Sequence, residues 1–235
     1  MKRSLLNINL RMCALSLIAL GVSLFASAQT HYESNIAVGG KAGVTLAKLR
    51  FNPSVPQSML LGTVMGATFR YVEERHFGLI VELNMEQRGW KEKFEGTSLS
   101  YYRRLTYLQL PLLTHIYFGS DKFHGFFNLG PEIAYMISSG TSSNFDYNNW
   151  SSVADQFVLG RETDQFTLPV KYKFDYGITV GAGMELIMAR KHSLVLEGRF
   201  YYGLHDVFSH EAKDPFSASS GMSVLATLGY YFRIK

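Results

Sequence analysis

Apolar and polar residues alternate with a period of two in one segment of the chain after another. Between residues 77 and 85 the odd positions are all apolar, while Glu82 and Glu86 stand at even positions. A strand places such residues on opposite faces, whereas a helix would set the glutamates beside the apolar stripe. The pattern therefore predicts a strand here.

The same pattern predicts eight strands, over residues 35–48, 59–72, 76–91, 100–118, 122–138, 172–189, 192–207 and 220–233. Tight polar turns at 73–75, 119–121 and 189–191 alternate with longer connections at 50–58, 91–99, 138–171 and 209–219. Short turns at one end and long loops at the other are typical of outer-membrane barrels. The predicted fold class is all-β, an eight-stranded antiparallel up-and-down transmembrane β-barrel with short periplasmic turns and longer extracellular loops.

The N-terminal segment has the composition of a secretory signal. Lys2, Arg3 and Arg11 accompany an uncharged apolar stretch over 12–25, and small residues follow at 26–28. This order is typical of a cleaved signal peptide, and the stretch is shorter than the roughly 20 apolar residues of a spanning helix. We predict a signal peptide over 1–28 and an outer-membrane β-barrel domain over 29–235. A retained N-terminal anchor is the alternative.

Signal cleavage changes the charge and removes the cysteine. The whole chain has 23 Lys and Arg against 19 Asp and Glu, and loss of the three N-terminal basic residues leaves 20 against 19. No basic block remains that would indicate nucleic-acid binding. The single cysteine, Cys13, falls in the predicted signal. Disulfides and thiol chemistry are therefore excluded from the predicted mature chain.

Alternation alone does not say which face of the barrel looks outward, because a secreted lipocalin-like ligand carrier would show the same period. Three features favour the membrane. The apolar face is nearly free of charge over the 9–11 residues that a spanning strand needs. The other face is rich in glycine, which suits a crowded interior, and aromatics gather near strand ends, as in interfacial girdles. We predict a location in the outer membrane, with outer-membrane lipid as a partner.

The polar face then lines the barrel interior. It carries the predicted interior charge network: Lys41, Arg70, Glu82, Glu86, Glu132, Asp175, Glu185, Glu197 and Arg199. Eight strands leave an interior that side chains fill, and buried charges there must pair. We therefore expect a salt-bridged plug, with Lys41 and Arg199 among its cations, and little conductance.

One strand resembles a known family. The sequence Tyr-Leu-Gln-Leu-Pro-Leu-Leu at 107–113 is similar to the Tyr-Leu-Glu-Ile-Pro-Leu-Leu strand of the PorT-like outer-membrane β-barrel proteins of Bacteroidetes. Further matches are Asn-Leu-Gly-Pro at 128–131, Asp-Tyr-Gly at 175–177, Gly-Arg-Phe-Tyr-Tyr-Gly-Leu at 198–204 and Leu-Gly-Tyr-Tyr-Phe at 228–232. The resemblance spans most of the predicted mature chain and implies an integral outer-membrane protein.

The resemblance also carries two expectations about function. One named member of the family supports protein secretion and gliding, so an accessory role in transport or secretion is an alternative function. Phe232 stands at the usual terminal aromatic, which makes it the predicted insertion signal for the outer-membrane assembly machinery. Two departures are Gln109, where the family often has an acidic residue, and the three residues that follow Phe232.

Two prolines fall inside predicted strands. Proline cannot donate to the hydrogen-bond ladder of a closed barrel, and Pro111 falls nearly opposite Pro131 when counted from the turn between their strands. We predict a β-bulge at that level in both strands. Early termination of one strand is the alternative.

One cluster has residue types that occur in catalytic sites. His205 and Asp206 are followed by Ser209, His210 and Glu211 at the loop end of a predicted strand. Such residues can activate water or assemble a hydrolase at the rim, but neighbours on a strand point to opposite faces. The spacing also matches no zinc signature. We therefore predict a polar loop root, no catalytic residues, no metal or other cofactor, and no enzyme activity.

The connection over 138–171 is longer than a structureless loop usually is. Phe145, Tyr147 and Trp150, set among asparagine and aspartate, suit contact with an extracellular protein or glycan. Asp146 and Asn148 are candidates for binding a calcium ion, and a disordered or merely long surface loop is the alternative. The leading hypothesis is a non-enzymatic structural and interaction protein that acts through its extracellular loops.

Overall fold

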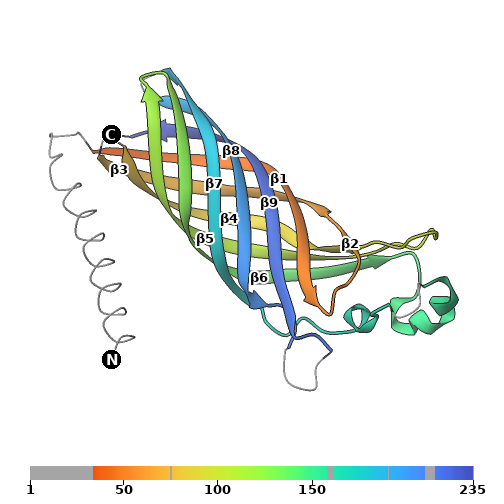
Figure 1. Cartoon of the computed structure of the whole chain (residues 1–235). Helices are drawn as coiled ribbons and strands as arrows, with labels where there is room; N and C mark the ends of the chain where they lie inside the picture. The colour runs from red at the N-terminus through yellow and green to blue at the C-terminus, as the bar shows by residue number, and fades with distance from the viewer. Residues whose placement is uncertain (1–33, 75, 158–160, 190, 210–214, 235) are drawn as a thin grey trace, which may run out of the picture. The chain divides into compact units, whose positions relative to one another are not determined.

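Eight long antiparallel strands close into a barrel in the part of the chain that the computed structural model describes, residues 34–234 apart from 75, 158–160, 190 and 210–214 (Figure 1). The strands are β1 (Asn35–Asn52), β3 (Leu60–Glu74), β4 (Phe77–Glu92), β5 (Tyr101–Ser120), β6 (Phe123–Ser143), β7 (Phe174–Ala189), β8 (His192–Asp206) and β9 (Ala218–Arg233). A two-residue strand, β2 (Gln57–Ser58), pairs with the end of β4. The predicted all-β, up-and-down fold of eight strands is confirmed. The signal peptide predicted over 1–28 lies outside the described residues.

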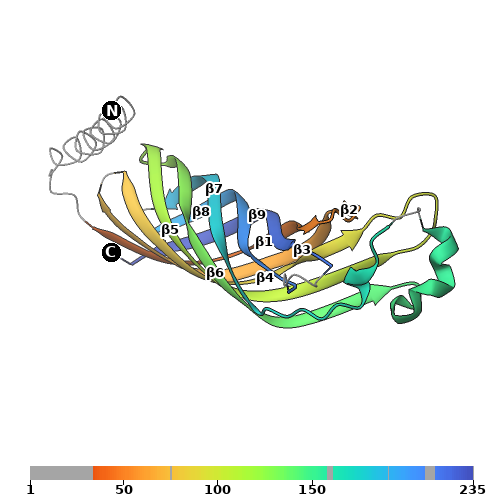
Figure 2. The same cartoon turned by 60° about the horizontal axis from the view of Figure 1, so that its bottom comes forward.

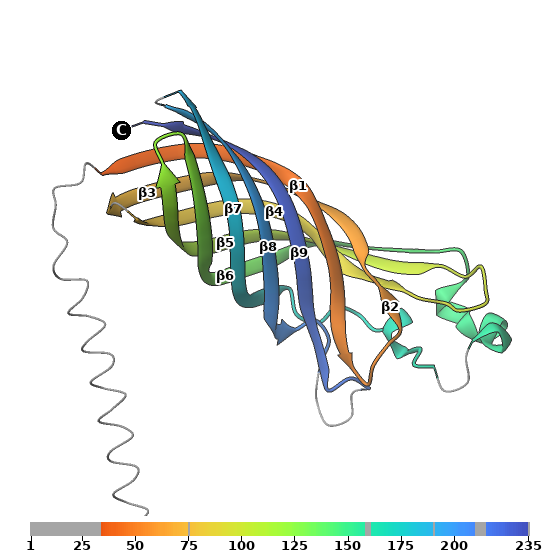
Figure 3. The ribbon, with the colours of Figure 1, turned by 45° about the horizontal axis from the view of Figure 1, so that its top comes forward.

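Each barrel strand pairs with its neighbours along the chain, and β1 pairs with β9 to close the sheet. Figure 3 shows β1 and β9 side by side along the wall. Short turns join β3 to β4, β5 to β6 and β7 to β8 at one end, here called the turn end. The long connections all lie at the opposite, loop end. Outer-membrane barrels keep their short turns in the periplasm and their long loops outside the cell.

The apolar face of every barrel strand looks outward. Leu61, for example, is 60% exposed, while Glu86 on the opposite face is fully buried in the lumen. Because the outer wall is apolar and the buried charged side chains lie inside, the wall has the apolar outer surface that a bilayer requires. The lipocalin-like alternative, in which the apolar face encloses a ligand, is therefore wrong.

Glycines on the lumenal face make room for large side chains from neighbouring strands. A Cβ atom at Gly177 would lie 2.3 Å from the carbonyl oxygen of Tyr202 and 2.7 Å from the Tyr201 ring. A Cβ atom at Gly183 would lie 2.4 Å from the Phe126 ring. The glycine-rich face therefore belongs inside, where it accommodates the aromatic rings that fill an eight-stranded barrel.

The bulge predicted at the prolines is absent, and both strands continue through them. Pro111 pairs with Glu132 and Thr114 pairs with Leu129, so the register between β5 and β6 does not shift across this level. The ladder skips the two positions opposite Gly130 and Pro131. Because proline has no N–H to donate, the ladder loses hydrogen bonds here, but no extra residue is inserted in either strand, as a bulge would require. The described register shift between these strands lies nearer the loop end, beside Thr106.

The connection predicted over 138–171 is shorter and more ordered than expected. β4, β5 and β6 run on together beyond the other strands at the loop end (Figure 2), and β6 ends only at Ser143. Two 3-10 helices follow, η1 (Tyr147–Gln156) and η2 (Asp164–Phe166). No helix in the described part of the chain is long and apolar enough to cross a bilayer.

Candidate functional site

The lumen is filled in three layers. The turn-end cluster is apolar and consists of Ala37, Val72, Tyr117, Phe126, Val195 and Tyr231. A charged middle follows, and a larger apolar cluster, the loop-end cluster, closes the opposite mouth. The nine side chains of the predicted charge network are all buried inside the barrel.

Two cations and two carboxylates form the centre of the charged layer. Arg199 on β8 reaches across the lumen and donates to both oxygens of Glu82 on β4, at 2.7 and 3.0 Å. Its second partner is Glu197, at 2.7 Å. Lys41 on β1 donates to Glu82 at 2.6 Å and lies 3.7 Å from Glu197. Such mutual pairing is what allows four buried charges to share the lumen.

A second pair links opposite walls nearer the turn end. Arg70 on β3 donates to the two oxygens of Glu185 on β7 at 2.7 and 2.8 Å, a bidentate geometry that is strong and directional. Ser193 donates a further hydrogen bond to Glu185 at 2.6 Å. The Arg70 guanidinium also lies over the Tyr231 ring, 4.7 Å from its centroid. This pair joins the charged layer to the turn-end cluster.

Arg88 is the third buried arginine, and the sequence reading missed it. Its guanidinium contacts three carboxylates: Glu132 directly, Glu86 at 3.0 Å and Asp175 at 3.4 Å. It also lies over the Tyr201 ring, 3.7 Å from the centroid. Arg88 continues the even-numbered face that already carries Glu82 and Glu86, so the same alternation could have identified it.

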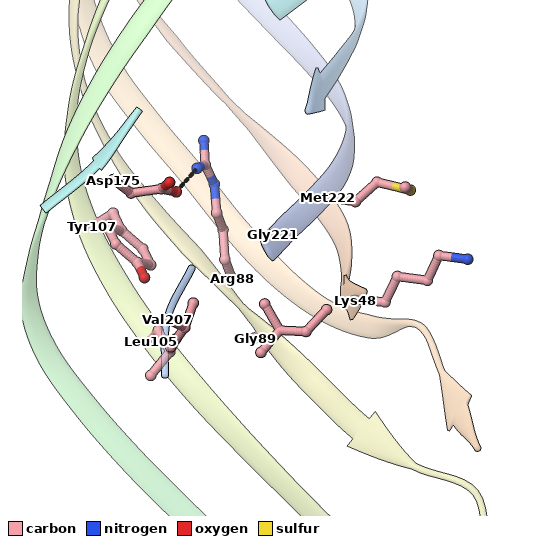
Figure 4. Close-up of a pocket in the computed structure, with 10 residues that line it drawn as sticks. Lys48, Arg88, Gly89, Leu105, Tyr107, Asp175, Val207, Gly221 and Met222 are labelled. Carbon is pink, nitrogen blue, oxygen red and sulfur yellow. Dashed lines mark hydrogen bonds and ion pairs between the residues drawn. The ribbon is translucent and has the colours of Figure 1, made fainter. Parts of the chain in front are cut away.

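Neighbouring side chains complete the coordination around Arg88. The hydroxyl of Tyr201 donates to Asp175 at 2.9 Å, and Thr45 donates to Glu86 at 2.8 Å. Gln109, the departure from the family pattern, also donates to Glu86. Figure 4 shows the Arg88 side chain directed toward Asp175. The two residues line a small cavity with a volume of about 10 Å³. That volume has room for about one water molecule.

The loop-end cluster is built from aromatic rings that converge from several strands. Phe51 on β1 lies 5.6 Å from Trp90 on β4, and Trp90 lies 5.8 Å from Phe208, just after β8. Tyr101 on β5 and Phe166 in η2 are 4.8 Å apart and extend the cluster over the mouth. Trp90 and Phe208 are almost fully buried, so this end of the lumen is closed by packed side chains.

A buried polar clasp, formed by Arg161, Glu92 and Gln165, holds the 161–168 segment against this cluster. Arg161 donates to Glu92 at 2.6 Å and to the carbonyl oxygen of Lys93 at 2.9 Å, and lies over the Phe94 ring at 4.2 Å. Gln165 donates to the second oxygen of Glu92 at 2.9 Å. Glu92 lies beyond the apolar band of the wall, and burial raises the pKa of its carboxyl although Arg161 and Gln165 favour the charged form.

The three aromatic residues predicted to be exposed for partner contact are half-buried instead. Phe145 packs against Phe94 and Phe166, Tyr147 against Tyr101, and Trp150 against Phe157. Their apolar surface completes the loop-end cluster, which explains why they turn inward. Asp146 caps η1 by accepting from the backbone N–H of Asn148 at 3.0 Å, and this bond accounts for its position.

The described members of the histidine cluster point to separate partners. His205 lies between the rings of Tyr172 and Tyr176, at 5.0 and 5.5 Å. Asp206 accepts a hydrogen bond from the backbone N–H of Ser219 rather than from His205. Ser209 accepts from Lys171 at 2.9 Å. His210 and Glu211 lie outside the described residues.

Phe232 lies on the outer wall near the end of β9, with its ring 5.3 Å from the His192 ring at the turn end. Its role as the signal for the assembly machinery stays a prediction.

Comparison with known proteins agrees with this architecture. A family model described as an outer membrane protein beta-barrel domain matches residues 26–209. The chain belongs to this family. Membership together with the outward apolar wall places the protein in the outer membrane, and the predicted localisation is confirmed. No curated protein matches the chain by sequence.

Solved structures of other members of this architecture are similar in fold. The outer membrane protein OprG from Pseudomonas aeruginosa has a TM-score of 0.52 at 12% identity, over 86% of this chain and 95% of that chain. Neisserial surface protein A has a TM-score of 0.47 at 11% identity, over 86% and 99%. The outer membrane enzyme PagL has a TM-score of 0.37 at 12% identity, over 83% of this chain and 98% of that chain. At such identities the likeness concerns the fold alone.

Proposed function

We propose that the protein is a non-enzymatic structural and interaction protein that acts through its extracellular loops. The observation that supports this proposal most directly is the ordered cap at the loop end, formed by residues 144–157 and 161–173. Its apolar side packs into the loop-end cluster, and the Arg161 clasp fixes it to β4. An ordered cap presents the same surface to every partner and loses little conformational entropy on binding.

The outer side of the cap is polar rather than aromatic. Asn148, Asn149, Ser151, Ser152 and Asp155 are all exposed along η1. Amide, hydroxyl and carboxylate groups are suited to hydrogen bonds with a glycan or a polar protein surface. We therefore assign partner contact to this face and not to Phe145, Tyr147 and Trp150, whose rings maintain the cap.

The absence of enzyme activity is part of the proposal. A rim hydrolase would need His205 to activate a nucleophile or a water molecule. Instead, its ring is held between two tyrosine rings, and the Asp206 carboxylate is directed to a backbone N–H. This arrangement favours a structural role for both residues.

The test uses the folded protein in lipid nanodiscs and arrays of glycans and surface proteins. A variant in which residues 144–157 are replaced by a short Gly-Ser link should keep the heat-dependent gel shift of a closed barrel and lose all array binding. Substituting Asn148, Ser151 and Asp155 by alanine should weaken binding while the cap stays packed. Undiminished binding by the variant without the segment would contradict the proposal.

A second candidate rests on the family resemblance. We infer that the chain belongs to the PorT-like group and assists protein secretion; the motif at 107–113 supports this inference. In the structure its polar residue, Gln109, donates to Glu86 within the Arg88 network. A strain that lacks the protein should then fail to deliver secreted proteins to its surface. Normal delivery in that strain would exclude this role and leave the first proposal intact.

A further inference from the structure

Two clusters of basic residues stand on the outer wall at the loop end, each beside a tyrosine. The first consists of Lys48 and Arg50 on β1 with Tyr202 on β8, and the Arg50 guanidinium lies 5.1 Å from the centroid of that ring. Leu49 and Phe51 are buried in the lumen, so Lys48 and Arg50, which alternate with them along β1, face outward. Figure 4 shows Lys48 extending away from the lumenal Arg88.

The second cluster repeats this arrangement on another part of the wall. It consists of Lys91 on β4 with Tyr102 and Arg104 on β5, and Lys91 pairs directly with Tyr102 in the ladder. The Arg104 guanidinium lies 5.5 Å from the centroid of the Tyr102 ring. We call the four cations Lys48, Arg50, Lys91 and Arg104 the basic girdle.

The girdle lies at the upper edge of the apolar band. Below Lys48 on the same face are the exposed side chains of Leu46 and Val44, and below Arg104, after Thr106, is Leu108. Tyrosine is enriched at the membrane–water interface, because its ring is apolar and its hydroxyl can contact water or lipid headgroups. The girdle cations are therefore at the depth of lipid headgroups in the outward-facing leaflet.

The girdle cations lack the partners that the lumenal cations have. Lys41, Arg70, Arg88 and Arg199 each contact at least one carboxylate. Within the described residues, no ion pair involves any of the four girdle cations. The Nε atom of Arg104 is also buried without a hydrogen-bond partner. Arg50 donates only to the hydroxyl of Tyr202 among the described hydrogen bonds.

Two carboxylates at the loop end are already engaged. Glu95 pairs with Lys93 at 2.9 Å, and Asp206 accepts from the Ser219 N–H. Glu73, Glu74 and Asp121 are exposed at the turn end, together with Lys122 and Lys191.

We propose that the basic girdle binds lipid phosphate groups in the outward-facing leaflet, one in each cluster. A guanidinium fork matches two phosphate oxygens, and a lysine supplies a second, more mobile positive charge. A phosphate would neutralise cations that the protein leaves unpaired. Two such contacts on separate parts of the wall fix the depth of the barrel in the membrane. This inference concerns the wall and does not depend on what the cap binds.

The test counts lipids bound to the folded protein in neutral maltoside micelles by native mass spectrometry. The probes are phosphatidic acid and the diacylglycerol with the same acyl chains. We expect up to two phosphatidic acid molecules on the wild type and none of the diacylglycerol. The pair of substitutions Lys48→Gln and Arg50→Gln should remove one site, and Lys91→Gln with Arg104→Gln the other. Each should weaken its site by about tenfold or more, since hydrogen bonds to charged groups contribute about 1.5–3 kcal/mol.

Matched controls separate the girdle from charge in general. Lys122→Gln with Lys191→Gln makes the same charge change at the turn end and should leave both sites intact. Arg50→Lys with Arg104→Lys keeps the charge but removes the fork, and should weaken binding less than the glutamine variants. Millimolar inorganic phosphate should not displace the lipid. Equal binding of the diacylglycerol, or unchanged binding by the fourfold glutamine variant with a normal heat-dependent gel shift, would overturn the proposal.

Discussion

At the scale of single residues, the buried arginines differ in how many carboxylates depend on each. Arg70 is bound to one carboxylate and Arg199 to two, while Arg88 lies among three. Removing one member of a buried ion pair leaves an uncompensated charge, which costs far more than the pair contributes. The stability of the lumen is therefore most sensitive at Arg88.

The first prediction follows from this difference. Arg88→Met leaves Glu86, Glu132 and Asp175 without their shared cation and should lower the free energy of unfolding by about 3–5 kcal/mol. Urea unfolding in lipid vesicles, monitored by tryptophan fluorescence, measures the change. Lys93→Gln, which breaks the exposed pair with Glu95, is the control and should leave stability unchanged. Equal behaviour of the two variants would show that the Arg88 network is not stabilising.

A second prediction concerns the lumenal glycines. Gly177→Ala places a Cβ atom 2.3 Å from the carbonyl oxygen of Tyr202 and 2.7 Å from the Tyr201 ring, which contacts Arg88, so the backbone and the ring must shift. Overpacking of this kind costs about 1–3 kcal/mol. Gly140→Ala, near the loop end of β6, is the control because its Cβ atom has nothing within 4 Å among the described residues. It should change stability by less than about 0.5 kcal/mol in the same urea assay. An equal, small loss in both variants would argue against crowding in the lumen.

At the scale of elements, the alternation of residues was enough to predict every barrel strand. It works because one face of each strand must be apolar and the other polar along the whole membrane-spanning length. It also extends to Arg88, which the sequence reading overlooked. It failed at the prolines, where the ladder tolerates missing hydrogen bonds without a bulge. Beyond the apolar band no lipid imposes a period, so the extension of β6 was not predicted.

The cap is a clearer example of a feature that the alternation of residues does not predict. Arg161 and Glu92 are 69 residues apart, and nothing in the sequence near either one indicates the other. The aromatic residues of the cap were noticed, but composition alone does not show whether a ring faces a partner or the protein's own core. Their inward packing depends on the loop-end cluster, which residues from β1, β4, β5, β6, η2 and the segments after β8 and before β9 assemble.

The third prediction tests the clasp as a unit. Arg161→Met leaves Glu92 buried without its cation, so the segment 161–168 should detach while the barrel stays closed. Hydrogen exchange of that segment should accelerate, and the heat-dependent gel shift should persist. Adding Glu92→Leu to Arg161→Met removes the unpaired charge and should restore most of the protection. Unchanged exchange in Arg161→Met would mean that the aromatic cluster alone holds the cap.

At the scale of the whole molecule, two apolar clusters and a paired charged layer fill the lumen in series. Water and ions must pass all three to cross the barrel. The loop-end cluster is closed by Trp90 and Phe208, the middle by cross-lumen ion pairs, and the turn end by Tyr117, Phe126 and Tyr231. The cavity beside Arg88 has a volume of about 10 Å³, room for about one water molecule. Closure therefore does not depend on a single residue.

The last prediction is that the barrel conducts no ions, in contrast to wider barrels with an aqueous channel. The folded wild type, added to a planar bilayer in potassium chloride, should show no unit conductance. Trp90→Ala removes the central ring of the loop-end cluster, yet it should also stay closed because the Arg88 and Arg199 layers lie beneath it. A stable conductance in the wild type would show that the lumenal side chains move together, and would favour transport over an interaction role. Conductance in Trp90→Ala alone would instead assign the whole seal to the loop end and leave the ion pairs a purely structural role.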